Sequence, residues 1–267
     1  MSIQITTEGP VRVIAIDRPA ARNAVDPATA QALFDAFLGF EADPDLAVAV
    51  LTGTAGSFCA GFDLKSAGSG AADAWMAQLD IPADWDDPAA TPLPGPMGPS
   101  RLMLSKPVIA AIEGHAVAGG MELAAWCDLR VMAETATTGV FCRRWGVPLI
   151  DGGTVRLPRL LGQGRANDLI LTGRPVGAAE AQAMGFASRV VPEGQARAAA
   201  IALGQELARF PQSCMRADHL SARPAPAELA AALRREWVSA ASFAAEGRAG
   251  AARFAAGKGR GGDFADL

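Results

Sequence analysis

Hydrophobic and polar residues alternate at the start of the chain and then give way to helical spacing. Two β-rich runs, "IQIT" and "VRVIAIDRP", flank the turn signal "TEGP", and this order predicts a β-hairpin. The next run, "PATAQALFDAFLGFEA", predicts a helix, with Asp26 as its N-cap and Pro27 at its first position. The chain therefore begins with a hairpin that is followed directly by a helix.

Three further β-rich runs follow, "LAVAVLTG", "PVIAAIEG" and "LRVMAE", and Gly-rich turns or helical stretches separate them. Such alternation predicts an α/β domain whose strands are covered by helices. From about Pro211 the chain is rich in alanine and has no β-rich run, which predicts a helical tail. Because its helices are poor in large apolar residues, we expect them to complete their burial against a partner chain.

The segment from Ala67 to Ser100 differs from the rest, since it is rich in proline and aspartate and contains Trp75 and Trp85. A long loop in a compact domain is usually a functional segment or a disordered one. We favour a lid or pocket wall, in which the tryptophans and Met76 pack on an apolar ligand.

Composition narrows the function classes. Half of the 267 residues are hydrophobic, which suits a sizeable core, and the net charge of −4 argues against electrostatic binding to nucleic acid or membranes. No apolar run is long enough to predict a membrane span, and the N-terminus lacks the pattern of a signal peptide. These features predict a cytoplasmic protein.

Few side chains are available for metal or proton chemistry outside the carboxylates. The four cysteines are far apart and form no CxxC pair, and the only histidines are His115 and His219, so no metal site is expected. Tyrosine is absent. Proton transfer by side chains must therefore fall mainly to Asp and Glu.

Two Gly-containing segments, "GSFCAGFDLK" and "GHAVAGGMEL", each follow a strand-like run. Each can aim a backbone N–H at a common point, and a pair of such donors is what an oxyanion needs. Tight turns alone would also explain either segment. Glu122, in the second segment, is placed either for acid/base chemistry or to stabilise the start of a helix.

The order of "DRPAARNAV", "SFCAGFDLK", "KPVIAAIEGHAVAGGMELAAWCDLRV" and "GGTVRLPRLLG" resembles the crotonase superfamily, also called the enoyl-CoA hydratase/isomerase family. The resemblance extends from about Val11 to Phe254. It implies a spiral of repeated ββα units in residues 1–205 and a helical region in residues 206–267 that builds trimers or dimers of trimers. It also implies an acyl-CoA substrate, whose coenzyme A is no separate cofactor, and an enolate stabilised at the thioester carbonyl.

Carried over residue by residue, the resemblance assigns the oxyanion hole to the backbone N–H groups of Phe62 and Gly119. Candidate CoA contacts are Arg22, Ala60, Asp63, Leu64 and Lys65, with Phe254 and Lys258 reaching the CoA of a neighbouring subunit. A solvated surface charge is the alternative role for Arg22 and Lys65.

Glu122 matches the first catalytic carboxylate of the family's hydratases, and helix capping is its alternative role. The second glutamate is missing, because Cys142 occupies the corresponding position. A thiol is mostly neutral near pH 7 unless its pKa is depressed, so we expect Cys142 to be a buried, inert thiol. Asp151 is the replacement candidate, and its alternative role is that of a turn or N-cap residue.

The sequence thus predicts an enoyl-CoA hydratase or dehydratase, with double-bond isomerisation as the second choice. One carboxylate that moves a proton between two carbons is sufficient for isomerisation. A non-catalytic binder of CoA esters is the alternative from another class, and the missing second glutamate favours it. No GxGxxG or GxxxxGK[ST] motif lies between a strand and a helix, so nucleotide-binding classes are disfavoured.

Overall fold

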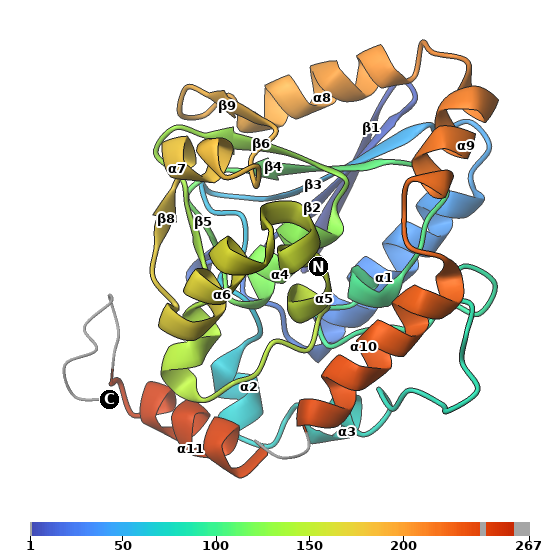
Figure 1. The fold of residues 1–267 in the computed structure, drawn as a ribbon. Coiled ribbons are helices and arrows are strands. Elements are labelled where there is room, and N and C mark those ends of the chain that lie inside the picture. The colour runs from blue at the N-terminus through green and yellow to red at the C-terminus, as the bar shows by residue number, and fades with distance from the viewer. Residues whose placement is uncertain (1, 241–243, 259–267) are drawn as a thin grey trace.

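The larger of two β-sheets runs through the middle of the protein (Figure 1). In the computed structural model, which describes residues 2–240 and 244–258, its strand order is β1–β2–β3–β4–β6–β9. The first pair is antiparallel, which confirms the predicted hairpin, and the later pairs are parallel. The strands are β1 (Ile3–Glu8), β2 (Val11–Ile16), β3 (Val48–Gly53), β4 (Val108–Ile112), β6 (Leu129–Ala133) and β9 (Arg189–Val191).

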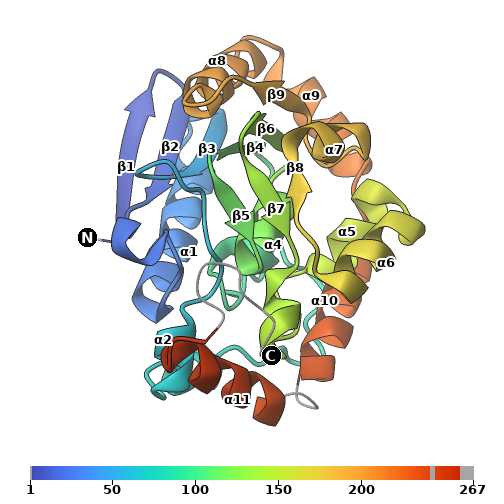
Figure 2. The same cartoon turned by 90° about the vertical axis from the view of Figure 1, so that its left-hand side faces the viewer.

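Helices cover both faces of this sheet (Figures 1 and 2). On one face Val13 and Val50 belong to a buried cluster with residues of α8 (Ala196–Leu207). On the other face Ile14 and Leu51 share a cluster with residues of α1 (Pro27–Ala42) and α4 (Gly119–Trp126). Apolar side chains on both faces are typical of a mainly parallel sheet.

A smaller sheet contains β5 (His115–Val117), β7 (Thr137–Gly139) and β8 (Val176–Gly177). It is built by repeated units, because β4 and β5 precede α4, and β6 and β7 precede α5 (Gly153–Leu161). Each unit places one strand in the large sheet, one in the small sheet and a helix beside them. This is the ββα repetition that the sequence predicts.

Helix α1 begins as its sequence predicts. The side chain of Asp26 accepts a hydrogen bond from the N–H of Thr29 at 2.9 Å, and Pro27 is the first helical residue. Both features stabilise a helix N-terminus, since the cap satisfies a free N–H and proline has none to satisfy. The remaining helices before α8 are η1 (Pro19–Ala21), η2 (Pro99–Arg101), η3 (Phe141–Trp145), α2 (Leu64–Gly68), α3 (Asp73–Met76), α6 (Gln163–Thr172) and α7 (Ala178–Ala183).

The tryptophans of the 67–100 segment hold it to the protein. Trp75 and Trp85 are only 8% and 5% exposed. Their ring N–H groups donate to the carbonyl oxygens of Pro96, at 3.1 Å, and Thr91, at 2.6 Å. Both indoles are therefore buried against the protein itself, and the role of this segment as a lid or pocket wall stays a prediction.

The C-terminal region is helical, with α9 (Gln212–Ser221), α10 (Pro226–Ala240) and α11 (Ala244–Ala255). Helix α10 packs on α5, and α11 packs on α2 and η3 (Figure 2). Of the predicted region 206–267, residues 241–243 and 259–267 lie outside the described residues, and its boundary at 205 stays a prediction. Within the described part of the chain, no helix has both the length and the apolar character needed to cross a membrane.

Asn23 fixes the turn that leads to the first Gly-containing segment. Its side chain is buried, and its amide N–H₂ donates to the carbonyl oxygens of Thr54, at 2.9 Å, and Ser57, at 2.6 Å. Its amide oxygen accepts from the N–H of Arg18 at 2.9 Å. The residue has a positive φ of 58°, which asparagine tolerates better than most side chains.

Asn23→Ala is expected to lower the free energy of unfolding by about 2–3 kcal/mol, because it leaves buried backbone groups without partners. Urea unfolding of the variant and of the wild type measures the difference. Gln31→Ala, which removes an exposed amide from α1, is the control and should change stability by no more than about 0.5 kcal/mol. Equal losses in both variants would contradict the role assigned to Asn23.

Candidate active site

Two segments that are far apart in the sequence lie side by side at the end of β5. The N–H of Cys59 donates to the carbonyl oxygen of His115 at 2.8 Å, and the N–H of Val117 donates to that of Cys59 at 3.0 Å. Further along, Gly61 abuts Gly119, since a Cβ atom on Gly61 would lie only 3.0 Å from the nitrogen of Gly119. A glycine at position 61 therefore permits this close approach.

The backbone hydrogen bonds that join the neighbouring residues do not use the N–H groups of Phe62 and Gly119. Val25 donates to the carbonyl of Gly61 and accepts from the N–H of Asp63, both at 2.8 Å. Because successive N–H groups of an extended chain point in opposite directions, that of Phe62 points away from Val25. Gly119 is the first residue of α4, so its N–H has no acceptor within the helix. The structure thus brings together the segments that carry both predicted oxyanion donors.

Ala118 makes an abrupt turn between β5 and α4. Its φ of 54° and ψ of −127° are unusual for a residue with a side chain, and such a conformation costs on the order of 1–3 kcal/mol. The N–H of Ala118 donates to the carbonyl oxygen of Gly139 at 2.9 Å, which holds the turn. Strained residues of this kind cluster at functional sites.

Glu122 lies in the first turn of α4 and is 3% exposed. Its Oε1 accepts hydrogen bonds from the N–H groups of Asp151 and Gly153, both at 2.9 Å. Burial raises the pKa of Glu122 well above its ordinary value, and the charges of Asp151 and Glu236 add to the effect. The two N–H groups oppose the shift. Burial and the nearby charges thus favour the protonated form of Glu122, whereas the two N–H donors favour the ionised form.

The Asp151 carboxylate is also buried, and it holds the loop that precedes η2. Its Oδ1 accepts from the N–H of Met97 at 2.9 Å and from the hydroxyl of Ser100. Burial raises the pKa of Asp151, while these two donors counteract the rise. Met97 in turn packs on the oxyanion segment, since a Cβ on Gly119 would lie 2.9 Å from its Sδ. Asp151 is not the N-cap of α5, which is Gly152.

Cys142 is a neutral thiol. It is buried in η3, and burial, together with the negative charge of Glu122, raises its pKa to about 12. A thiol with that pKa is neither an acid nor a base near pH 7. This supports the interpretation of Cys142 as an inert residue next to the candidate acid.

Five of the candidate CoA contacts, Arg22, Ala60, Asp63, Leu64 and Lys65, lie close to Phe62 in sequence or contact its segment through the backbone. The N–H of Ala60 donates to the carbonyl of Arg22 at 3.1 Å, and the side chains of Arg22 and Lys65 are exposed. Asp63 caps α2 by accepting from the N–H of Lys65 at 3.0 Å, and it pairs with Arg18 at 3.0 Å. The carboxylate of Asp63 is therefore committed to the protein. Leu64 begins α2 and is partly exposed.

Phe254 lies on α11, and Lys258 follows this helix. The ring of Phe254 meets that of Trp145 in the same chain edge to face, with centroids 5.2 Å apart. No space separates the two elements, because a Cβ on Gly250 would overlap the carbonyl group of Trp145. In this chain α11 thus packs against α2, which follows Phe62, and against η3, which contains Cys142. Contact of Phe254 and Lys258 with the CoA of a neighbouring subunit stays a prediction.

Sequence reasoning missed three charged residues that surround the two carboxylates. Arg101 is 1% exposed and Glu236 4% exposed, and both are therefore buried deeply for charged residues. Arg156 donates to the carbonyl oxygens of Asp151, at 2.9 Å, and Ser100, at 2.7 Å. No motif marks Arg101 or Glu236, and Arg156, although it lies in the "GGTVRLPRLLG" segment, also fits an ordinary surface position of a helix.

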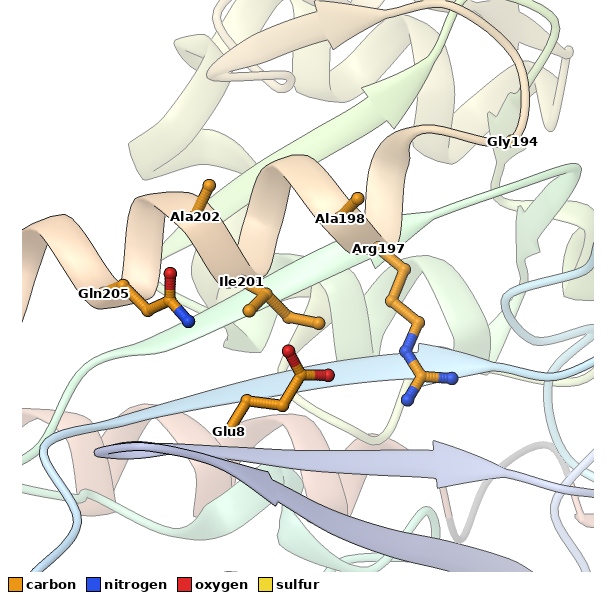
Figure 3. Close-up of a pocket in the computed structure, with 7 residues that line it drawn as sticks. All are labelled: Glu8, Gly194, Arg197, Ala198, Ile201, Ala202 and Gln205. Atoms are coloured by element: carbon orange, nitrogen blue, oxygen red, sulfur yellow. The ribbon is translucent and has the colours of Figure 1, made fainter.

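A surface groove between β1 and α8 lies elsewhere (Figure 3). Glu8 extends from β1 toward Ile201 of α8, and Arg197 lies on the same helix. The groove is on the α8 side of the large sheet, whereas α4 and Glu122 are on the opposite side. It contains none of the predicted site residues.

Comparison with known proteins places the chain in a family. A family model described as enoyl-CoA hydratase/isomerase matches residues 6–94 and 99–255. The chain belongs to the enoyl-CoA hydratase/isomerase family. The predicted resemblance is thereby confirmed, and so is an enzyme of this family as the class of protein.

Individual relatives of this family agree. The chain is 36% identical over 210 residues to the enoyl-CoA hydratase EchA19 of Mycobacterium tuberculosis, which covers 76% of this chain and 73% of the relative. It is 39% identical over 211 residues to a carnitinyl-CoA dehydratase of Salmonella typhi, covering 77% and 74%. The crystal structure of a carnitinyl-CoA hydratase from Mycobacterium avium matches with a TM-score of 0.82 and 28% identity over 96% of both chains. This structural match confirms the predicted ββα fold with C-terminal helices.

Because the pKa of Glu122 is raised, we expect the free energy of unfolding of this protein to depend on pH. In the window between the unfolded pKa and the raised native pKa, the unfolded chain releases a proton that the native protein keeps. Stability therefore falls as the pH rises through this window. Glu122→Gln removes the ionisable group while its amide oxygen still accepts the two N–H bonds.

We expect the stability of Glu122→Gln relative to the wild type to increase as the pH is raised from about 4, near the ordinary glutamate pKa, to neutrality. Thermal or urea unfolding at a series of pH values measures this difference. Glu228→Gln, at an exposed position of α10, should show no such trend. Parallel stability curves for the Glu122 variant and the wild type would show that burial does not shift its pKa.

Proposed function

We propose that this chain is an enoyl-CoA hydratase-like lyase, which adds water reversibly to the double bond of an enoyl-CoA thioester. The observation that carries the proposal is the position of Glu122, three residues after Gly119 in the same helix and buried beside it. Three residues correspond to a rise of about 4.5 Å along the helix. A thioester whose carbonyl oxygen binds the N–H of Gly119 would thus present its α and β carbons near this carboxyl group.

The proposed oxyanion hole consists of the N–H groups of Phe62 and Gly119. As water attacks the β carbon, the π electrons move toward the thioester carbonyl and charge develops on its oxygen. Each donor fixed at that oxygen in the transition state contributes about 3 kcal/mol. The positive end of the α4 dipole adds to the stabilisation.

Glu122 is proposed as the main group that transfers the proton, with Asp151 as the candidate second acid/base group. The Glu122 carboxylate takes one proton from water as the water oxygen bonds to the β carbon, and an enolate forms. The enolate then collapses, and the α carbon takes the same proton from Glu122. Water is added with no other reagent, and the active form at the start is the ionised carboxylate.

CoA binding is proposed for the five candidate contacts near Phe62. Arg22 and Lys65 supply exposed positive charges for phosphate groups, and Ala60 and Leu64 supply backbone and apolar contacts. Asp63 contributes through its backbone and its cap of α2, since its carboxylate is paired with Arg18. Assembly into trimers or dimers of trimers, with Phe254 and Lys258 at a neighbouring CoA, and a cytoplasmic location complete the proposal.

Double-bond isomerisation is the second candidate, and the state of Cys142 favours it. A thiol with a raised pKa at the position of the second glutamate leaves Glu122 and Asp151 as the candidate acid/base carboxylates. One carboxylate is sufficient to move a proton between the α and γ carbons of an enoyl thioester. The names of the dehydratase and hydratase relatives support water addition and removal as the first choice.

Glu122→Gln is expected to reduce kcat about 100- to 10,000-fold, the usual contribution of a general acid/base, with little change in CoA-ester binding. The loss of absorbance of the conjugated thioester during hydration of a straight-chain trans-2-enoyl-CoA measures kcat. Calorimetry measures binding. An unchanged kcat would reduce Glu122 to a helix-capping residue. A wild-type protein that binds the thioester and converts neither the 2-enoyl nor the 3-enoyl isomer would establish the non-catalytic alternative.

Asp151→Asn and Cys142→Ala separate the candidates for the second group. We expect the Asp151 variant to lose at least about 1.4 kcal/mol of transition-state stabilisation, a tenfold effect on kcat/KM, and the Cys142 variant to stay near wild type. Both are assayed with one enoyl-CoA for water addition and for double-bond migration. The opposite ranking would assign the role to Cys142.

A further inference from the structure

Glu236, near the end of α10, reaches the turn that holds Glu122. It is 4% exposed. Its Oε1 accepts from the N–H of Gly152 at 2.5 Å, and its Oε2 accepts from the N–H of Thr154 at 2.8 Å and from the Thr154 hydroxyl. The carboxylate thus satisfies two N–H groups at the start of α5 that the helix itself leaves without acceptors.

The hydrogen bonds of this turn alternate between two carboxylates. The N–H groups of residues 151 and 153 donate to Glu122, and those of residues 152 and 154 donate to Glu236. Gly152 makes the alternation possible with a positive φ of 88°, and it has no room for a side chain because Arg156 and Leu233 lie against it. The turn is therefore clamped from both sides.

The neighbouring residue of α10 fixes the same region. Trp237 lies 4.6 Å under the guanidinium of Arg101, whose buried N–H group donates to the carbonyl of Leu79 at 2.6 Å. The end of α10 thus packs both on the turn at 151–154 and on the loop that ends in η2. Glu236, in the C-terminal helical region, is thus connected to Glu122 through the hydrogen bonds of the 151–154 turn.

We propose that Glu236 is a positioning residue for Glu122, which holds the 151–154 turn so that two N–H groups meet the Glu122 carboxylate and places a second negative charge nearby. The proposal rests on the function proposed above. Glu122 faces charged or titratable groups from each element around it, namely Asp151 from the turn, Arg156 from α5, Cys142 from η3 and Glu236 from α10, with Arg101 behind Asp151.

Two consequences follow, one geometric and one electrostatic. Without the Glu236 acceptor, the buried N–H group of Gly152 has no partner and that of Thr154 loses its acceptor, so the turn must shift to find another for Gly152. Without its charge, the pKa of Glu122 falls, because the charge of Glu236 contributes to its rise. Since the ionised form of Glu122 starts the reaction, the acidic limb of the kcat profile then moves to lower pH.

The pH profile of kcat for hydration of a straight-chain trans-2-enoyl-CoA tests this in the full chain. In Glu236→Gln, which keeps the shape, we expect the acidic limb to move down by about one pH unit. Glu236→Asp keeps the charge, but its shorter side chain withdraws the carboxylate from the turn. We therefore expect the acidic limb of its kcat profile to stay at the wild-type pH while kcat falls about tenfold. Glu228→Gln makes the same charge change at an exposed position of α10 and should match the wild type.

A folded Glu236→Gln protein whose acidic limb coincides with that of the wild type would overturn the proposal, even if its kcat is lower. If that variant does not fold, wild-type kcat in Glu236→Asp would overturn it and a reduced kcat with an unmoved limb would support it. Failure of the proposed function is distinguishable, because then either the wild type converts no enoyl-CoA or Glu122→Gln keeps the turnover of the wild type. A readout without catalysis is the pH-dependent stability difference between the wild type and Glu122→Gln, which should shrink when both proteins also carry Glu236→Gln.

Discussion

The arrangement depends on one interaction, the acceptance of two backbone N–H groups by the buried carboxyl group of Glu122. A carboxylate that is 3% exposed is costly unless it has hydrogen-bond partners or takes up a proton. The turn at Asp151 to Gly153 supplies the partners, and burial with nearby negative charge favours the proton. Opposing effects therefore act on the protonation of this carboxyl group, which lies beside the N–H at the start of α4. The chemistry proposed for the site depends on these effects.

Several elements of the fold position Glu122 and the backbone groups around it. The ββα units bring the 59–62 and 115–119 segments together, and the strained turn at Ala118 starts α4 where Gly119 abuts Gly61. The same carboxyl group is reached from three directions, by α4 itself, by the turn before α5 and, through this turn, by α10. Helix α10 of the C-terminal region is thus connected to Glu122 through the hydrogen bonds of this turn.

The sequence predicts the backbone framework well and the buried polar contacts poorly. The hairpin, the capped start of α1 at Asp26, the β-rich runs and the two Gly-containing segments are local patterns, and short-range physics determines them. Glu236 and Arg101 depend on contacts between residues that are distant in sequence, and a charged residue in a helix or loop is usually on the surface. The sequence predicts Trp75 at a ligand, but tertiary packing buries its indole against the protein. Whether Asp151 replaces the missing glutamate stays a prediction, since its buried position suits both a catalytic and a loop-holding role.

A crystal structure with a bound, unreactive analogue of an enoyl-CoA tests the central claim most directly. The account predicts a thioester carbonyl oxygen about 3 Å from the nitrogens of both Phe62 and Gly119, with the Glu122 carboxyl group facing the α and β carbons. It also predicts that the N–H groups of Asp151 and Gly153 remain on Glu122 in that complex. A carbonyl oxygen bound elsewhere, or an acyl chain directed away from Glu122, would contradict it.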